Sequence, residues 1–341
     1  MSGGAYAGVD VGGGGIRVRI ETGGGVLAQG EDPAPVPRVQ GRVDLDRLAA
    51  RITTAVAKAT AGEGAAGEAS GTPGGTGAGG WFDAMAVGVT GLPGLVRDPS
   101  TLWRVLGARF GLGALVVAGD MVTTHVGALG FRPGVVVAAG TGVITLGTDL
   151  DGVWNQADGW GHLLGDHGSG AWVGAQGLQA ALRAHDGRAG GSPILLERMT
   201  ARYGHPLDLV AAVYESGAAA HQLASFAPDV AAAARAGDPV AQGIWAEAGR
   251  HLGQAAVAAA QGLESVFSWG GRLFDAADLL MEPFQSTVRD LLPGARFAPP
   301  RGTSADGALA LAKGAADGAV RPHHPYLYVF TADRSRAGTS R

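Results

Sequence analysis

The sequence predicts an α/β protein built from two similar domains, and three observations support this prediction. Short apolar runs alternate with helical patterns over residues 84–129, as strands and helices do along an α/β sheet. Two apolar strands joined by a glycine-rich turn occur at residues 5–20, and the same order returns at residues 135–147. The length of 341 residues also suits two domains.

The composition excludes several kinds of chemistry. The formal net charge is -4 and the basic residues are scattered, so nucleic acid is not an expected partner. The chain has no cysteine, which rules out disulfides, thiolate zinc sites and cysteine-held iron–sulfur clusters. Polar residues interrupt every apolar run, and residues 1–4 show no basic segment ahead of an apolar one. We therefore expect a cytoplasmic protein with no membrane partner.

The first half is expected to begin as a sheet meander and to continue with alternating helices and strands. Residues 61–80 contain no large apolar side chain, so we expect them to be a disordered surface insertion. The expected strands are 5–10, 16–20, 84–89 and 114–118, and the expected helices are 44–59, 100–110 and 120–129.

The second half is expected to repeat the meander and then to become largely helical. Residues 170–263 follow a helical pattern that breaks at Gly237–Pro239. The expected strands are 135–139, 143–147, 265–269 and 296–298, and the later helices are 277–292 and 304–313. Residues 321–341 are expected to form a frayed tail.

Three glycine-rich turns each follow a predicted strand, and such turns let backbone amides approach a phosphate closely. Each one alone fits an ordinary tight turn, but the set of three favours a phosphate site. A strand rather than a helix follows the first turn and no P-loop lysine is present, which excludes the dinucleotide and Walker patterns. The carboxylate before the first turn could hold a hydrated Mg²⁺. These residues are Asp10, Gly12, Gly13, Gly14, Gly140, Thr141, Gly142, Gly270 and Gly271.

Asp120 follows the apolar strand at 114–118 and opens the next helix. The position predicts an N-cap, because Asp is a preferred residue there. It also lies at the carboxyl edge of the sheet, where α/β proteins bind ligands. A carboxylate at that edge can accept a proton from an attacking hydroxyl group.

Residues 159–170 combine Trp160, His162, Asp166 and His167 with five glycines. Polar side chains where the backbone is most adaptable are typical of a binding loop. The two histidines and Asp166 could also ligate a metal, but their spacing matches no zinc pattern. We favour recognition of a hydroxylated ligand.

These motifs together resemble the N-acetylglucosamine kinase-like branch of the sugar kinase, heat-shock ATPase and actin superfamily, also described as the BadF-type ATPase family. The resemblance runs over about residues 5–316, and its most specific part is the segment 159–170. It implies two ribonuclease H-like (actin-like ATPase) domains with a central interdomain cleft. The implied boundaries are 1–118 and 119–316, the latter with helical additions, followed by a flexible tail at 317–341.

The resemblance also implies an activity. ATP with Mg²⁺ would be held by the three glycine turns, with Asp10 holding the metal through water and Asp120 acting as catalytic base. The implied partner is an amino sugar such as N-acetylglucosamine or glucosamine, or another sugar or a cyclitol, and the implied assembly is a homodimer. The implied substrate-binding residues are Thr90, Gly91, Trp160, Asp166 and His167.

Two positions depart from the family pattern. Gly14 stands where the family has a threonine whose hydroxyl touches the γ-phosphate, and His167 stands where it has a glutamate. Loss of one hydrogen bond to a charged group, about 1.5–3 kcal/mol, would slow transfer by one to two orders of magnitude unless backbone amides substitute. A sugar-binding sensor without phosphate transfer is therefore an alternative.

Overall fold

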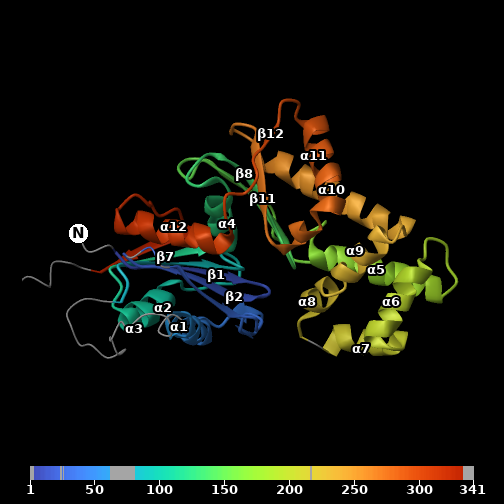
Figure 1. The fold of residues 1–341 in the computed structure, drawn as a ribbon, viewed down its shortest axis with the longest axis horizontal. Helices are drawn as coiled ribbons and strands as arrows, with labels where there is room; N and C mark the ends of the chain where they lie inside the picture. Colours follow the sequence, from blue (N-terminus) through green and yellow to red (C-terminus); the bar gives the residue numbers. More distant parts are fainter. Residues whose placement is uncertain (1–3, 24, 26, 62–80, 216, 333–341) are drawn as a thin grey trace, which may run out of the picture. The chain divides into compact units, whose positions relative to one another are not determined.

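The computed structural model describes residues 4–23, 25, 27–61, 81–215 and 217–332. The chain forms two compact units, of which unit 1 is residues 1–130 with 301–341 and unit 2 is residues 131–300 (Figure 1). Each unit is centred on one mixed sheet.

The sheet of unit 1 begins with the expected meander. Three strands run antiparallel in the order β3-β2-β1, and β6 and β7 continue the sheet parallel to β1. A sixth strand, β13, closes the other edge antiparallel to β7. The bounds are β1 Tyr6–Gly12, β2 Gly15–Glu21, β3 Leu27–Asp32, β6 Ala84–Val89, β7 Ala114–Gly119 and β13 Leu327–Thr331.

Helices cover both faces of this sheet, with α1 below it and α12 above it in Figure 1. The predicted helix over residues 100–110 is present, but its middle turn, η1, is a π-helix. A two-stranded ribbon of β4 (Arg38–Val39) and β5 (Arg42–Val43) precedes α1. The helix bounds are α1 Leu45–Ala61, α2 Ser100–Leu102, η1 Trp103–Gly107, α3 Ala108–Phe110, α4 Asp120–Leu129 and α12 Ser304–Ala316.

The alternation along β2 decides which side chains meet which helix. Ile16, Val18 and Ile20 are buried in the core shared with α1. The intervening Arg17 and Arg19 lie on the opposite face, because successive residues of a strand point to opposite sides. On that face α12 packs so close to β1 that a side chain at Gly8 would collide with its backbone.

The sheet of unit 2 repeats the strand order of unit 1. The meander runs β10-β9-β8, and β11 and β12 follow parallel to β8, as β6 and β7 follow β1. The similarity of the two α/β halves, expected from the two strand-turn-strand segments, is confirmed. The bounds are β8 Gly134–Ala139, β9 Val143–Thr148, β10 Trp154–Asp158, β11 Val266–Gly270 and β12 Arg296–Phe297.

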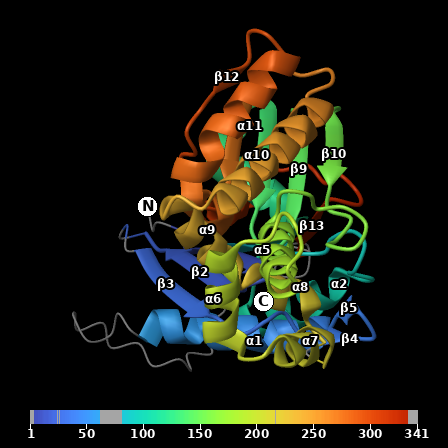
Figure 2. The ribbon, with the colours of Figure 1, turned by 90° about the vertical axis from the view of Figure 1, so that its right-hand side faces the viewer.

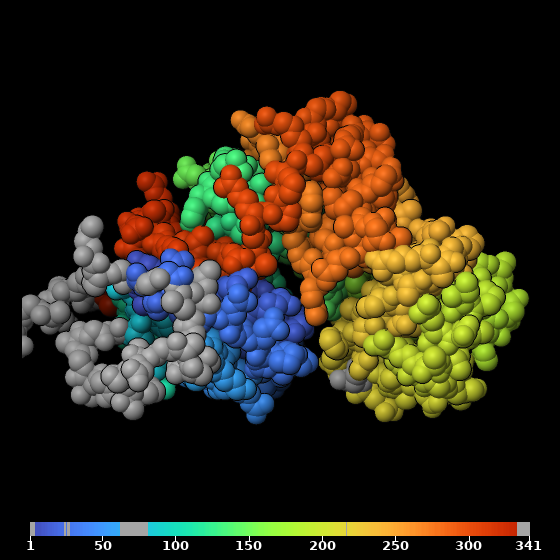
Figure 3. Space-filling view, viewed as in Figure 1, coloured from blue at the N-terminus to red at the C-terminus, as the bar shows by residue number. Residues whose placement is uncertain are grey.

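Helices α10 and α11 lie side by side against the sheet of unit 2 (Figure 2), and Phe267 of β11 and Phe284 of α11 are fully buried there. The space-filling view in Figure 3 shows the atoms of this part of the chain as one adjoining orange region. The expected break between α9 and α10 falls at Gly237, and Asp238 caps α10. Within the described ranges, no helix has the length and apolarity to cross a bilayer. The helix bounds are α5 Gly170–His185, α6 Pro193–Tyr203, α7 Pro206–Glu215, α8 Ala219–Ala224, α9 Ala227–Arg235, α10 Pro239–Ala259, η2 Arg272–Ala276 and α11 Ala277–Leu291.

The structure divides the chain elsewhere than at the expected boundary of 118/119. Helix α4 stays in unit 1, and the chain returns there at residue 301 to add α12. A side chain at Gly307 would collide with the backbone of α4. The packing of α12 against α4 therefore depends on small residues, which the spacing of apolar residues along the sequence does not reveal. The expected tail at 317–341 is also corrected, because residues 327–331 pair with β7 as β13. The expected insertion lies, apart from residue 61 at the end of α1, outside the described residues.

Candidate active site

Three of the candidate site residues lie at the same edge of the sheet of unit 1. Asp10 is near the end of β1, Thr90 follows β6, and Asp120 follows β7. Because β1, β6 and β7 are parallel neighbours, their carboxyl ends meet at one edge. The structure therefore brings together residues that are 110 positions apart in the sequence.

Asp10 is almost enclosed, with 6% of its surface exposed. The Ser304 hydroxyl at the start of α12 donates to Oδ1 at 2.8 Å, and Arg17 Nη1 donates to Oδ2 at 3.3 Å. Burial raises the pKa of Asp10, against the hydrogen bond from Ser304 and the positive charge of Arg17, which lower it. Sequence reasoning missed Ser304 and Arg17 as partners of Asp10, although the alternation of β2 placed Arg17 opposite the apolar face.

Asp120 is the first residue of α4 rather than its cap, because Gly119 takes the N-cap position. The carboxylate instead accepts hydrogen bonds from the Thr90 hydroxyl and the Met121 amide. Burial, and after it the negative charge of Asp10, raises the pKa of Asp120 to about 7, while those hydrogen bonds oppose the rise. A carboxyl group with this pKa is suited to accept a proton at neutral pH.

The hydroxyl groups of Thr123 and Ser304 link the backbone of Asp120 to the carboxylate of Asp10. Ser304 Oγ donates to Asp10, and the single proton of Thr123 Oγ1 can be donated either to Ser304 Oγ at 2.8 Å or to the backbone oxygen of Asp120 at 2.9 Å. A side chain at Gly88 would collide with Thr123, so the close approach of β6 to α4 also depends on a glycine. These two hydroxyl groups connect α4, α12 and β1 at the site.

The turn Gly140–Thr141–Gly142 in unit 2 is fixed by the start of α5. The amides of Gly170 and Ala171 donate to the carbonyls of Gly140 and Thr141 at 2.8 and 3.0 Å. Gly271, which follows β11, has φ +96°, and a side chain there would collide with the Ala139 carbonyl. Because β8 and β11 are parallel neighbours, the second and third glycine turns lie at one edge of their sheet.

Asp166 organises the binding loop from within. Its Oδ1 accepts hydrogen bonds from the amides of Gly159 and Gly161, both at 3.1 Å, and the carboxylate also accepts one from the Val143 amide. Its residue is 6% exposed and has φ +56°. Burial raises the pKa of Asp166 and these amides oppose the rise. These hydrogen bonds fix the loop and the strand after the Gly140 turn, and the expected contact of Asp166 with substrate hydroxyl groups stays a prediction.

His167 is exposed at the end of this loop and belongs to an aromatic group with α10. Its ring centroid lies 5.2 Å from that of His251, against which Trp172 packs edge-on. His251 Nε2 lies 3.2 Å from Glu247 Oε1. Burial lowers the pKa of His251, as do the charges of His167 and Arg250. Sequence reasoning missed His251 and Trp172, which lie on different helices, α10 and α5, and share no local motif.

Trp160 is exposed, with 65% of its surface accessible, and Leu163 and Leu164 in the same loop are 83% exposed. Gly91 follows Thr90 with φ +83°. Among the described residues, no three histidine or acidic side chains are arranged as metal ligands.

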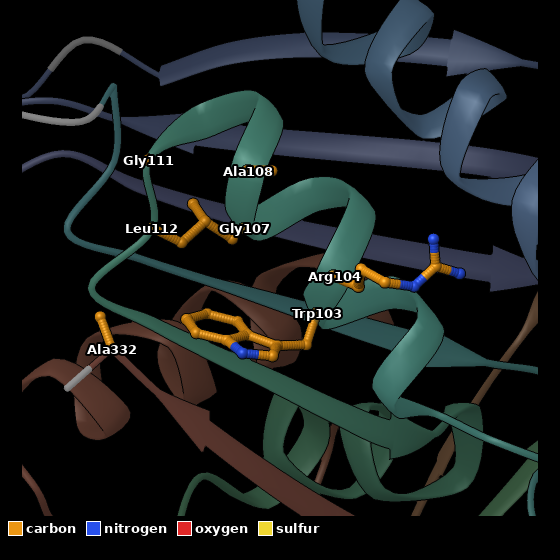
Figure 4. Close-up of a pocket in the computed structure, with 7 residues that line it drawn as sticks. All are labelled: Trp103, Arg104, Gly107, Ala108, Gly111, Leu112 and Ala332. Atoms are coloured by element: carbon orange, nitrogen blue, oxygen red, sulfur yellow. The ribbon is translucent and has the colours of Figure 1, made fainter.

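An open hollow of about 420 Å³ lies beside η1 in unit 1, and none of the candidate site residues lines it (Figure 4). Trp103 borders it and stacks on Phe330 of β13, with ring centroids 6.3 Å apart. The hollow has no carboxylate or histidine, so it offers no group for proton transfer. Its lining is Trp103, Arg104, Gly107, Ala108, Gly111, Leu112 and Ala332.

The repeated sheet order and the residues at the strand ends define the class of protein, which is an α/β protein with the two-domain sugar kinase fold. A solved candidate N-acetylglucosamine kinase from Chromobacterium violaceum has a TM-score of 0.66 and 29% identity over 91% of this chain and 99% of that one. A ROK family glucokinase from Streptomyces griseus, solved with glucose and AMPPNP, shares the fold at a TM-score of 0.58 and 19% identity, covering 91% and 98% of the two chains. The predicted fold class is confirmed.

The chain belongs to the BadF/BadG/BcrA/BcrD ATPase family, whose model matches residues 7–288. A curated relative, the N-acetylmuramic acid/N-acetylglucosamine kinase of Clostridium acetobutylicum, is 28% identical over 243 residues, which are 69% of this chain and 78% of the relative. The N-acetyl-D-glucosamine kinase of Dictyostelium discoideum is 49% identical over 53 residues, 16% of this chain and 17% of that protein. The resemblance inferred from the motifs is confirmed.

Proposed function

We propose that this protein is an ATP-dependent sugar kinase that transfers the γ-phosphate to a hydroxyl group of an amino sugar such as N-acetylglucosamine or glucosamine. The observation that carries the proposal is Asp120, a carboxylate with a pKa of about 7 held beside Asp10 at the carboxyl edge of the sheet. The family membership and the named activities of the relatives support it.

Asp120 acts as the general base in this proposal. As the sugar oxygen attacks the γ-phosphorus, its proton passes to the Asp120 carboxylate, and the bond between that phosphorus and the bridging oxygen of ADP breaks. Thr90 holds the carboxylate in position. The turns at Gly12–Gly14, Gly140–Gly142 and Gly270–Gly271 offer backbone amides to the nucleotide phosphates and room for the nucleoside.

The residues around Asp10 fit a Mg²⁺ ion held through water. A carboxylate oxygen is a ligand that Mg²⁺ prefers, and the negative charge of Asp10 already acts on Asp120, so a cation there would relieve the repulsion. Bound Mg²⁺ would neutralise charge on the phosphate oxygens. Ser304 and Arg17 hold the Asp10 carboxylate in one orientation.

The acceptor contacts are proposed for Gly91, Trp160 and His167. Trp160 offers an exposed ring to the apolar face of a sugar, and His167 offers an imidazole to its hydroxyl groups. Asp166 contributes by fixing the loop that carries them. Another sugar or a cyclitol is the alternative acceptor. We also propose that the protein forms a homodimer, and sedimentation equilibrium tests this.

A coupled ADP-release assay tests the proposal. Amino sugars, neutral hexoses and cyclitols are offered with ATP and Mg²⁺, and turnover without acceptor is the baseline. We expect at least one amino sugar to stimulate ADP release well above that baseline. No stimulation by any compound, together with binding of one of them in a thermal-shift screen, would instead indicate a sugar-binding sensor.

Replacement of Thr90 is expected to move the pH profile. Since the Thr90 hydroxyl lowers the pKa of Asp120, Thr90→Val should raise it, and the rise of kcat/KM with pH should shift upward from about pH 7 by about 0.5–1 unit. Thr90→Ser keeps the hydroxyl and should leave the profile in place. Identical profiles for Val and Ser would contradict the assignment of Thr90 as the residue that positions the base.

Replacement of His167 is expected to change acceptor preference. His167→Glu puts a carboxylate beside His251 and near Asp158, so the ratio of kcat/KM between two acceptors should change by about fivefold or more, with the KM for ATP unchanged. His162→Glu, in the same loop, is the control. Equal effects of the two variants on the acceptor ratio would refute a role for His167 in recognition.

A further inference from the structure

Arg17 and Asp10 face each other directly across the first hairpin. The register of β1 and β2 pairs the two residues, so both side chains lie on the face that α12 covers. Arg17 Nη1 lies 3.3 Å from Asp10 Oδ2, the oxygen that Ser304 does not use. Asp10 Oδ2, which the proposed Mg²⁺ site needs, is therefore occupied by the guanidinium group of Arg17.

The Arg17 guanidinium is placed so that it can leave. Its side chain is 39% exposed, and its other partner, Glu31 at 3.5 Å, is 74% exposed. The exposed Arg17–Glu31 pair contributes little to stability, so the contact that must be replaced when Arg17 moves is the one with Asp10, whose side chain is only 8% exposed. The next residue on the same face, Arg19, makes the comparable pair with Asp306 at 3.1 Å, farther along α12.

The turn beside Arg17 offers a phosphate no side chain of its own. Residues 12–15 are all glycine, and a side chain at Gly12 would meet no protein atom within 4 Å. Backbone amides can approach a phosphate there, but the charge must come from elsewhere. Arg17, two residues beyond the turn, has the planar fork of donors that binds phosphate oxygens in pairs.

We propose that Arg17 is a nucleotide-binding residue that exchanges its partner Asp10 for the phosphate oxygens when the nucleotide binds. Without nucleotide its guanidinium holds Asp10 Oδ2 and excludes a divalent cation from it. When the phosphates of a nucleoside diphosphate or triphosphate occupy the glycine turn, Arg17 moves to the phosphate oxygens, and Asp10 becomes available to the metal ion. This inference rests on the proposed binding of ATP, but not on the identity of the acceptor or on turnover.

Two binding measurements on the full-length protein test the exchange, and neither needs catalysis. Mn²⁺ alone is titrated by electron paramagnetic resonance, and ADP in EDTA is titrated by calorimetry. For Arg17→Gln we expect Mn²⁺ to bind about fivefold tighter, because Asp10 is freed, and metal-free ADP to bind about tenfold weaker, because a phosphate partner is lost. Arg19→Gln is the matched control and should leave both affinities within twofold of the wild type.

The opposite signs separate an exchange of partners from a structural role. If Arg17 only braced the hairpin, Arg17→Gln would weaken both ligands or change neither, and either result overturns the inference. A tighter Mn²⁺ site with unchanged ADP affinity also overturns it, because Arg17 would then have no phosphate partner. Opposite shifts in a protein that no acceptor stimulates would support the exchange while refuting the kinase proposal, so the two failures are distinguishable.

Discussion

Asp120→Asn is expected to lower turnover by about 1000-fold while making the folded protein more stable. General base catalysis contributes about 10²–10⁴ in rate, and an amide cannot accept the proton. The amide oxygen can still accept hydrogen bonds from Thr90 and the Met121 amide, so binding of ATP and acceptor should change by less than about threefold. The coupled ADP-release assay measures the rate, and calorimetry measures the binding.

The gain in stability follows from the sign of the pKa shift. The folded chain holds the Asp120 proton up to a pKa of about 7, whereas the ordinary pKa of an aspartate is 3.8. Between these values the folded state binds more protons, so this residue's contribution to stability falls as the pH rises from 4 to 7. If the whole pKa difference counted as free energy of unfolding, the loss at high pH would be at most about 4 kcal/mol. Solvent screening reduces this, so we expect Asp120→Asn to raise the free energy of unfolding by about 1–2 kcal/mol at pH 8.

The matched control is Asp98→Asn. Asp98 also precedes a helix and accepts a hydrogen bond from the Ser100 amide at 3.0 Å, but it lies on the surface and outside the site. Its Tm and turnover should stay within error of the wild type, while Asp120→Asn raises Tm by about 2–4 °C at pH 8 and by less at pH 4. Loss of turnover together with a lower Tm at pH 8 would show that Asp120 is a stabilising group, not a destabilised base.

Asp166→Ala is expected to lower stability and acceptor affinity together. The amides of Gly159, Gly161 and Val143 lose their acceptor in a buried setting, where each unsatisfied donor costs about 1–3 kcal/mol. Water entering the space left by the carboxylate offsets part of this, so we expect a net loss of about 3 kcal/mol and a fall in Tm of about 6 °C or more. The acceptor KM should rise at least fivefold because the loop that carries Trp160 and His167 loses its internal support.

Asp149→Ala is the control for this loss. Asp149 Oδ1 also accepts two backbone hydrogen bonds, from Asp151 and Val153 at 2.9 Å, but in a surface loop where water can replace it. The expected cost is below about 1 kcal/mol, with no effect on the acceptor KM. Asp166→Ala with an unchanged Tm but a raised KM would indicate that Asp166 contacts the sugar directly.

The sequence predicted most of the elements, and the exceptions have physical causes. Strand β10 was missed because Asn155 and Gln156 give it no apolar alternation, and its position at the sheet edge demands none. Strand β13 was missed because it pairs with β7, more than 200 positions earlier. The N-cap expected at Asp120 shifted by one residue to Gly119, since the Asp120 side chain is engaged by Thr90.

The candidate site shows the same division. The residue types at the strand ends identified Asp10, Asp120 and the glycine turns, because the carboxyl edge of a sheet is where a ligand can meet backbone amides and side chains together. The sequence did not predict that Ser304 would reach Asp10 across 294 positions, or which protein groups Thr90 and Asp166 would bind. Hydrogen-bond partners are chosen by three-dimensional proximity, which local patterns do not encode.

From the sequence alone come the two α/β halves, the family and the carboxylates, since each depends on periods and motifs within about twenty residues of chain. Only the tertiary structure decided that α12 crosses back to cover β1 and that Arg17 holds Asp10. The reason is that both depend on close packing at Gly8 and Gly307 and on strand register, and neither property has a period along the chain.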